Sequence, residues 1–252
     1  MIRPALLVVP WIASAAHRRW SEDALASVRC STPLDRLAVV NALRPGTDDE
    51  SWLRERFDLV EHNDRNVLAR AWNRGIRRAL ERGASHVIVM NLDLILHPRC
   101  LDNLLASAIE RPDLLVWGAT EWRSPLTFPL AELKPAWEGT PHWSCFMVAR
   151  RLLETVGEFD EQFVPAYYED KDMLRRIFLA GGAVGNRTDA LFLHQERGSI
   201  MGLLDAPAAE VEARVALMRT FRAQIADNEV RYIRKWGGPP GEESFSAPYA
   251  GR

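Results

Sequence analysis

The chain has 252 residues, of which 47% are hydrophobic and 26% are charged, a composition typical of globular proteins. This length suits one large α/β domain with a single core. The 32 basic and 34 acidic residues leave a formal net charge of −2, which argues against bulk binding to nucleic acid or to an acidic membrane.

Apolar runs alternate with helical patterns through the first 118 residues. Strands are predicted at 5–9, 37–40, 57–61, 86–90 and 114–118, and helices at 21–31, 66–83 and 98–109. Ser21 is expected to cap the first helix. The run at 86–90 is almost continuously apolar, which is typical of a strand that is buried on both faces. The alternation predicts an α/β fold whose mostly parallel, Rossmann-like central sheet carries helices on both faces.

The second half is less regular. Residues 120–143 contain four prolines and three tryptophans, and irregular segments of this length usually have a function. An apolar segment at 145–149 and a strand at 190–193 are expected, with helices at 151–156, 169–180 and 207–225. Residues 1–200 are predicted to form the catalytic domain, with halves at about 1–97 and 98–200, and 201–252 to form a helical extension packed on it.

Cysteine content and hydropathy indicate the compartment. Cys30, Cys100 and Cys145 lie far apart, and such an odd, sparse set forms neither a disulfide framework nor a zinc cluster. No apolar run approaches the roughly 18 residues of a membrane span. The apolar start at 5–9 is interpreted as a strand, because it lacks the long apolar region and cleavage site of a signal peptide. We therefore expect a cytoplasmic protein.

Polar residues follow the predicted strands at 86–90 and 190–193. Asp93 closes the triplet Asn91-Leu92-Asp93 just after the first strand, and His194 follows the second. Ligands of open α/β sheets bind beyond the carboxyl ends of the strands, and a buried carboxylate is costly unless it is paired or holds a metal. If the strands are parallel, Asp93 and His194 share one edge, where they and diphosphate oxygens would suit Mn²⁺ or Mg²⁺.

Acidic residues open the predicted helix at 169–180. Glu169 and Asp170 could be there only because acids favour a helix N-terminus. Asp170 could also face the same crevice and take a proton from a hydroxyl nucleophile. Asp172 is interpreted as a solvated or capping acid, and His194 could be an ordinary structural histidine.

Five segments, in order, resemble motifs of family 2-type glycosyltransferases with the GT-A fold, over roughly the first 200 residues. They are Leu7-Val8-Val9-Pro10, similar to the first strand; 66–76 (NVLARAWNRGI), similar to the Asn-x-Gly helix segment; Asn91-Leu92-Asp93, similar to the Asp-x-Asp metal motif; 157–163 (GEFDEQF), similar to G-x-F-D-E-x-F; and 168–172 (YEDKD), similar to the Glu-Asp motif.

The resemblance implies an inverting enzyme that moves a sugar from a nucleotide-diphosphate donor to a saccharide-type hydroxyl acceptor, in surface glycan synthesis. It implies a divalent cation, Mn²⁺ or Mg²⁺, bound by Asp93, and Asp170 as the catalytic base; the position of His194 at the end of its strand makes it the expected second metal ligand. The expected donor contacts are Pro10, Asn41, Asn66, Asn73, Asn91 and Asp93. The expected acceptor contacts are Trp122, Trp143 and Glu169, since aromatic faces bind sugar C–H surfaces, although these tryptophans could equally be packing residues.

The chain departs from the family pattern at three positions. Asn41 stands where the family carries an acid that binds the base, Asn91 replaces the first acid of the metal motif, and Leu68 replaces the glycine of Asn-x-Gly. These changes leave a degenerate carbohydrate-binding or scaffold module as one alternative. A sugar nucleotidyltransferase is another, but the segment 10–14 lacks the glycine-rich phosphate loop that it normally has. Oligomeric state and peripheral membrane association stay open.

Overall fold

The computed structural model describes residues 2–10, 12, 15–41, 48–123, 128, 134–195 and 211–251, and the statements below concern these residues. The strands are β1 (Pro4–Val8), β2 (Asp35–Val40), β3 (Leu59–His62), β4 (His86–Met90), β5 (Leu94–Leu96), β6 (Leu114–Glu121), β7 (Trp137–Glu138), β8 (Cys145–Ala149) and β9 (Ala183–His194). The helices are α1 (Ala15–Ser27), α2 (Asp48–Arg54), α3 (Leu68–Glu81), α4 (Cys100–Glu110), α5 (Arg150–Val156), α6 (Glu169–Leu179) and α8 (Val211–Trp236).

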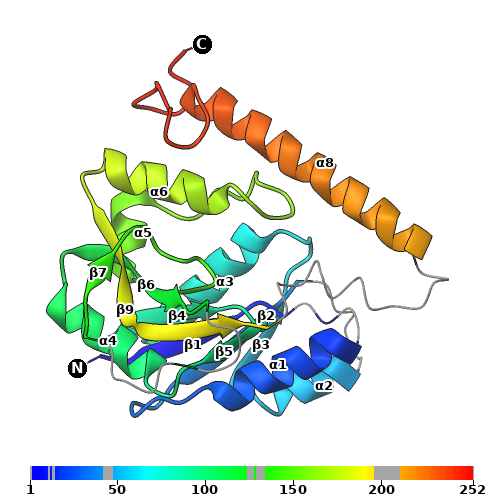
Figure 1. Ribbon diagram of the computed structural model, residues 1–252, viewed down its shortest axis with the longest axis vertical. Coiled ribbons are helices and arrows are strands. Elements are labelled where there is room, and N and C mark those ends of the chain that lie inside the picture. The colour runs from blue at the N-terminus through cyan, green and yellow to red at the C-terminus, as the bar shows by residue number, and fades with distance from the viewer. Residues whose placement is uncertain are drawn as a thin grey trace.

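The strands form one sheet in the order β3-β2-β1-β4-β8-β6-β9-β5, with β7 paired to β9 (Figure 1). The half that contains β3, β2, β1 and β4 is entirely parallel. Beyond β4 the pairing is antiparallel except between β6 and β9. The predicted α/β class is confirmed, and the parallel character is concentrated in the first half of the chain, where strands and helices alternate most regularly.

Helices cover both faces of the sheet. Alternate side chains of β4 enter two different cores: Ile88 and Met90 pack with α1, α2 and α4, whereas Val87 and Val89 pack with α3, α5 and α6. Figure 1 shows α6 on the side of the sheet opposite α1 and α2. The interpretation of 86–90 as a strand buried on both faces is therefore confirmed.

Several expected boundaries differ from the structure. Helix α1 begins at Ala15, so Ser21 lies inside it, where its hydroxyl donates to the His17 carbonyl at 2.8 Å instead of capping. The strand expected at 190–193 is the end of the longer β9, and the irregular segment 120–143 contains the end of β6 and all of β7. Pairing between strands that are far apart in the sequence determines the extent of β6, β7 and β9, and local sequence patterns do not reveal this pairing.

The carboxyl-terminal end of α8 packs on the domain. Tyr232 and Trp236 are fully buried with Phe163 in a separate small core. The helix expected at 207–225 continues to Trp236, while 207–210 lie outside the described residues. Within the described part of the chain, none of the helices is both long and apolar enough to cross a bilayer.

Candidate active site

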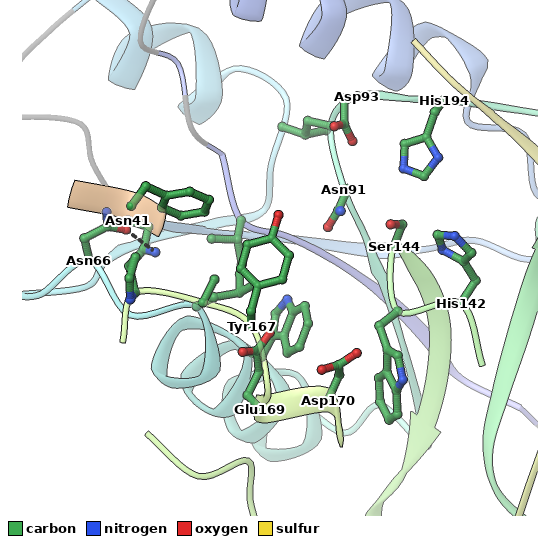
Figure 2. Close-up of a pocket in the computed structure, with 18 of the residues that line it drawn as sticks. Asn41, Asn66, Asn91, Asp93, His142, Ser144, Tyr167, Glu169, Asp170 and His194 are labelled. Carbon is green, nitrogen blue, oxygen red and sulfur yellow. Dashed lines mark hydrogen bonds between the residues drawn. The ribbon is translucent and has the colours of Figure 1, made fainter. Parts of the chain in front are cut away.

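A cleft of about 700 Å³ lies beyond the carboxyl ends of β1, β4 and β9. Its volume falls in the range of small-molecule sites. The segments after β1 and β4 and the last residue of β9 contribute to its lining, together with the N-terminus of α6 and part of α8. The lining includes Val9, Asn41, Asn66, Asn91, Asp93, His142, Trp143, Ser144, Tyr167, Glu169, Asp170, His194, Phe221 and Gln224 (Figure 2).

Asp93 and His194 are brought together by the pairing of β5 with β9. Leu94 lies opposite His194 in this antiparallel pair, and the Gln195 backbone N–H donates to the Asp93 carbonyl at 2.8 Å. The Asp93 residue is only 9% exposed. The sequence argument placed both residues at one edge of the sheet, and the structure does so (Figure 2).

Asn91 joins the end of β4 to the segment before β8. Its backbone N–H donates to the Ser144 carbonyl at 2.8 Å, and its side chain lies in the cleft. Trp143, also in the cleft, packs edge-on against Phe146 with ring centroids 4.9 Å apart. Trp143 is therefore both a cleft residue and part of the core packing.

The N-terminus of α6 carries Glu169 and Asp170 into the cleft. The two preceding residues, Tyr167 and Tyr168, both have φ of +73°, a conformation that side chains rarely adopt and that is often found at functional sites. This turn leaves the Asp170 side chain 21% exposed at the N-terminus of α6. Asp170 is thus a solvent-accessible carboxyl group that faces the cleft (Figure 2).

Glu169 has very different surroundings from its neighbour. The residue is 4% exposed, and its Oε2 is a buried oxygen without a hydrogen-bond partner. Burial, and secondarily the charge of Asp170, raise the pKa of Glu169 to about 8. At neutral pH Glu169 is therefore a neutral carboxylic acid that can donate a hydrogen bond, beside the more exposed Asp170.

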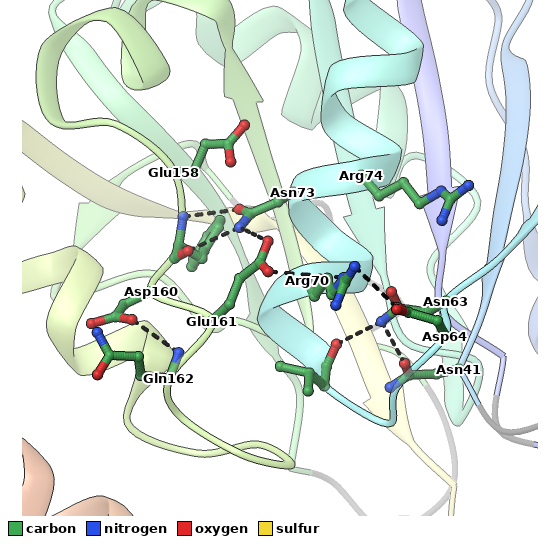
Figure 3. A network of polar contacts seen from close by, with 12 residues as sticks. Asn41, Asn63, Asp64, Arg70, Asn73, Arg74, Glu158, Asp160, Glu161 and Gln162 are labelled. Atoms are coloured by element: carbon green, nitrogen blue, oxygen red, sulfur yellow. Dashed lines mark hydrogen bonds and ion pairs between the residues drawn. The ribbon is translucent and has the colours of Figure 1, made fainter.

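Three asparagines, Asn41, Asn63 and Asn66, form a network of amides at the β2 side of the cleft; Figure 2 shows Asn41 with Asn66, and Figure 3 shows Asn41 with Asn63. The Asn41 amide donates to Asn66 Oδ1 at 2.9 Å and accepts from Asn63 at 2.9 Å. Asn63 also donates to the Val67 carbonyl at the start of α3. Asn41 and Asn66 both line the cleft, so the position of the expected acid is occupied by an amide that neighbouring amides orient.

Asn73, Pro10 and Trp122 do not line the cleft. Asn73 is 1% exposed, and its amide donates to the Phe159 carbonyl while accepting from the Phe159 N–H, both at 2.9 Å (Figure 3). This residue therefore ties α3 to the 157–163 segment, and the structure does not support its expected donor contact. Val9, and not the expected Pro10, lines the cleft after β1. The backbone N–H of Trp122 donates to the carbonyl oxygen of Phe192, just beyond the end of β6.

The sequence reasoning missed Glu121 and His142. Glu121 Oε1 lies 2.8 Å from His194 Nδ1, and Glu121 Oε2 lies 3.6 Å from His142 Nε2. Burial favours the protonated form of Glu121, but its hydrogen bond with His194 holds its pKa below the usual range. Burial and the neighbouring His194 lower the pKa of His142. The signal available in the sequence was weak: an acid three residues beyond a predicted strand and a histidine beside Trp143.

These side chains fit a divalent cation. One buried carboxylate, Asp93, and one imidazole, His194, both line this edge of the cleft, and the ligand atoms of Glu121, His142 and His194 lie within 4.8 Å of one another. Oxygen and imidazole nitrogen are ligands that Mn²⁺ accepts readily.

No protein-family model matches the chain, and no curated protein matches it. Solved structures do. The chain is similar to residues 1–349 of TarS from S. aureus (TM-score 0.56, 13% identity, 92% of this chain and 73% of that one). It is also similar to a mannosyltransferase of Pyrobaculum calidifontis solved with GDP-Man and Mn²⁺ (TM-score 0.55, 16% identity, 81% of this chain and 61% of that one). A third similar structure is GalNAc-T7 solved with UDP, GalNAc and Mn²⁺ (TM-score 0.62, 12% identity, 94% of this chain and 48% of that one).

These likenesses define the fold. The central sheet with helices on both faces is that of GT-A-type glycosyltransferases, which confirms the GT-A expectation. The chain spans less than two thirds of the mannosyltransferase and about half of GalNAc-T7.

Proposed function

We propose that this chain is an inverting, metal-dependent glycosyltransferase of the family 2 type. It would move a sugar from a nucleotide-diphosphate donor to a saccharide-type hydroxyl acceptor, in the cytoplasm and in surface glycan synthesis. The observation that carries the proposal is the placement of Asp170 in one cleft with Asp93 and His194. Similar folds solved with UDP or GDP-Man and Mn²⁺ support it.

The donor would occupy the side of the cleft formed by β1, β2 and β4. Asn41 and Asn66 would contact the base, and Asn91 and Asp93 the diphosphate side. A Mn²⁺ or Mg²⁺ ion near Asp93 and His194 would offset the diphosphate charge as the bond to the sugar breaks.

The acceptor would enter beside α6. Asp170 would take the proton from the attacking hydroxyl, because its carboxyl group is accessible from the cleft and lies at a helix N-terminus. Glu169, as a neutral acid, would donate a hydrogen bond to acceptor or donor oxygens, and Trp143 would present its ring to a sugar face.

Ligand binding and transfer are both measurable. We expect a nucleoside diphosphate to raise the melting temperature only in the presence of Mn²⁺ or Mg²⁺, because a ligand that binds only the folded state stabilises it. The nucleotide that does so identifies the donor to use in a transfer assay, and NMR of the new glycosidic bond reports its anomeric configuration. Retention of the donor's configuration would refute inversion, and a melt unchanged by every nucleotide tested would refute the donor site.

A further inference from the structure

Glu121, His142 and His194 form a cluster at the cleft edge. Of these three residues, only His194 is expected in the site from the sequence alone. Two of the three side chains, His142 and His194, line the cleft. Ligands held about 2.1 Å from a metal in tetrahedral geometry are roughly 3.4 Å apart. Glu121 Oε1 lies 2.8 Å from His194 Nδ1, and the other carboxylate oxygen, Oε2, lies 3.6 Å from His142 Nε2. One ligand atom from each of the three residues lies within 4.8 Å of the other two, so small side-chain movements would give the spacing that a bound ion requires.

The register of β6 and β9 places Glu121 and His194 on one face. The pairing jumps from Ala119 opposite Arg187 to Thr120 opposite Leu191, so β9 carries a bulge. After the bulge, Glu121 lies opposite Phe192, and His194 follows two residues later on the same face. Bulges commonly re-aim side chains next to functional sites.

A separate device fixes the turn that carries His142. Asn186 Oδ1 accepts from the His142 backbone N–H at 2.9 Å, and Asn186 Nδ2 donates to the Thr140 carbonyl at 2.6 Å. Asn186 can reach this turn only because residue 118 is glycine: a Cβ there would lie 2.0 Å from Asn186 Oδ1. The position of His142 is therefore built into the fold.

Phe192 holds both imidazole rings. Its side chain is completely buried, and its ring meets His142 and His194 edge-on with centroids 5.1 Å and 5.4 Å away. Rigid supports of this kind are what orient metal ligands in proteins.

We propose that Glu121, His142 and His194 form a two-histidine, one-carboxylate site that binds a transition-metal ion before any donor is present. Such a ligand set favours Zn²⁺, Mn²⁺ or Co²⁺ over Mg²⁺, which prefers oxygen ligands. Open coordination positions would face the cleft. This extends the proposed function, in which Asp93 would join the ion only together with the donor diphosphate, but metal binding itself does not depend on sugar transfer.

The test is calorimetric titration of the protein, without a histidine tag and without nucleotide, with Zn²⁺, Mn²⁺ and Mg²⁺. We expect one Zn²⁺ per chain and no comparable Mg²⁺ binding. His142→Gln and Glu121→Gln should each weaken Zn²⁺ binding at least about 10-fold. Asp93→Asn should change it little, and His97→Gln, which removes an imidazole outside the cluster, serves as the matched control.

Metal-free variants that have the same melting temperature as the metal-free wild-type protein exclude misfolding as the cause of weaker binding. The visible spectrum of the Co²⁺-loaded protein reports whether the histidines are ligands. The proposal is overturned if the wild-type protein binds no Zn²⁺. It is also overturned if His142→Gln or Glu121→Gln binds Zn²⁺ normally. Equal loss in Asp93→Asn and His142→Gln would also overturn it, because Asp93 would then be a resident ligand. All these outcomes are read without a transfer assay, so failure of the proposed function would be seen separately.

Discussion

Neighbouring carboxylates at the start of α6 behave differently because only one of them is buried. Asp170 is accessible at the helix N-terminus, whereas Glu169 is 4% exposed. Both side chains line the cleft, but a single residue of offset along the helix leaves Asp170 accessible and Glu169 almost fully buried in its wall. This contrast separates two roles that the Glu-Asp motif alone does not distinguish.

Asp170→Asn is expected to fold normally and to lose transfer by about 100-fold or more, since general-base contributions are commonly of that size. Initial rates of transfer and circular dichroism check this. Asp23→Asn, at an exposed position of α1, is the control and should keep full activity. Turnover near that of the wild-type protein in Asp170→Asn would remove Asp170 from the mechanism.

Glu169 should make stability fall with rising pH. The pKa of Glu169 is about 8 in the folded protein, against an ordinary value of 4.5. Between these values the folded state binds the extra proton, so the free energy of unfolding decreases as pH rises. Each unit of difference corresponds to roughly 1.4 kcal/mol, so the total is several kcal/mol. Urea unfolding at pH 5 and pH 8 should show this loss of free energy for the wild-type protein and a smaller loss for Glu169→Gln. The same change in the free energy of unfolding between the two pH values in both proteins would contradict the prediction.

At the scale of elements, α8 organises the loop that leads into α6. The Asn228 side chain donates to the carbonyls of Val164, Ala166 and Tyr167 at 3.0–3.2 Å and accepts from the Val164 N–H at 3.2 Å. Tyr167 lines the cleft and packs edge-on against Phe221 of α8. The helix therefore supports a cleft wall that is far from it in sequence.

Asn228→Ala is expected to destabilise the protein by about 1–3 kcal/mol, because several polar groups of the loop lose their partner. It should also raise the acceptor KM more than it lowers kcat, since Tyr167 would be less well held. Chemical unfolding and steady-state kinetics check both effects. Asp227→Ala makes a similar truncation at an exposed position of the same helix and should change neither; equal effects in the two variants would contradict a specific role for Asn228.

At the scale of the whole molecule, the extension is joined to the domain by a buried charge network. Asp172 is completely buried and contacts three partners: Lys235 at 2.6 Å, the Trp236 indole N–H at 2.9 Å and Arg176 at 2.9 Å. Lys235 also contacts Asp160 at 2.7 Å. The interpretation of Asp172 as a solvated or capping acid is therefore wrong, because its side chain is completely buried and one of its partners, Trp236, lies 64 residues further along the chain.

A chain that ends at residue 200 should be strongly destabilised, although 1–200 was expected to contain the catalytic domain. Removal of Lys235 and Trp236 leaves Asp172 with a single described partner, and breaking a buried ion pair costs about 3–5 kcal/mol. Thermal unfolding of the truncated and full chains, each assayed for solubility, checks this. If the truncated chain had the same melting temperature as the full chain, the stability of residues 1–200 would not depend on the extension.

The sequence by itself determined the class of fold and the three principal residues of the cleft. Strand runs, helix starts and the placement of Asp93, Asp170 and His194 beside them are local patterns, and the direction of the strands brings their ends to one edge. Only the tertiary structure decided that Asn73 holds Phe159, that Asp172 is buried, and that Glu121 and His142 meet His194. Each of these depends on contacts between segments far apart in the chain, which hydrophobic periodicity and short motifs do not encode.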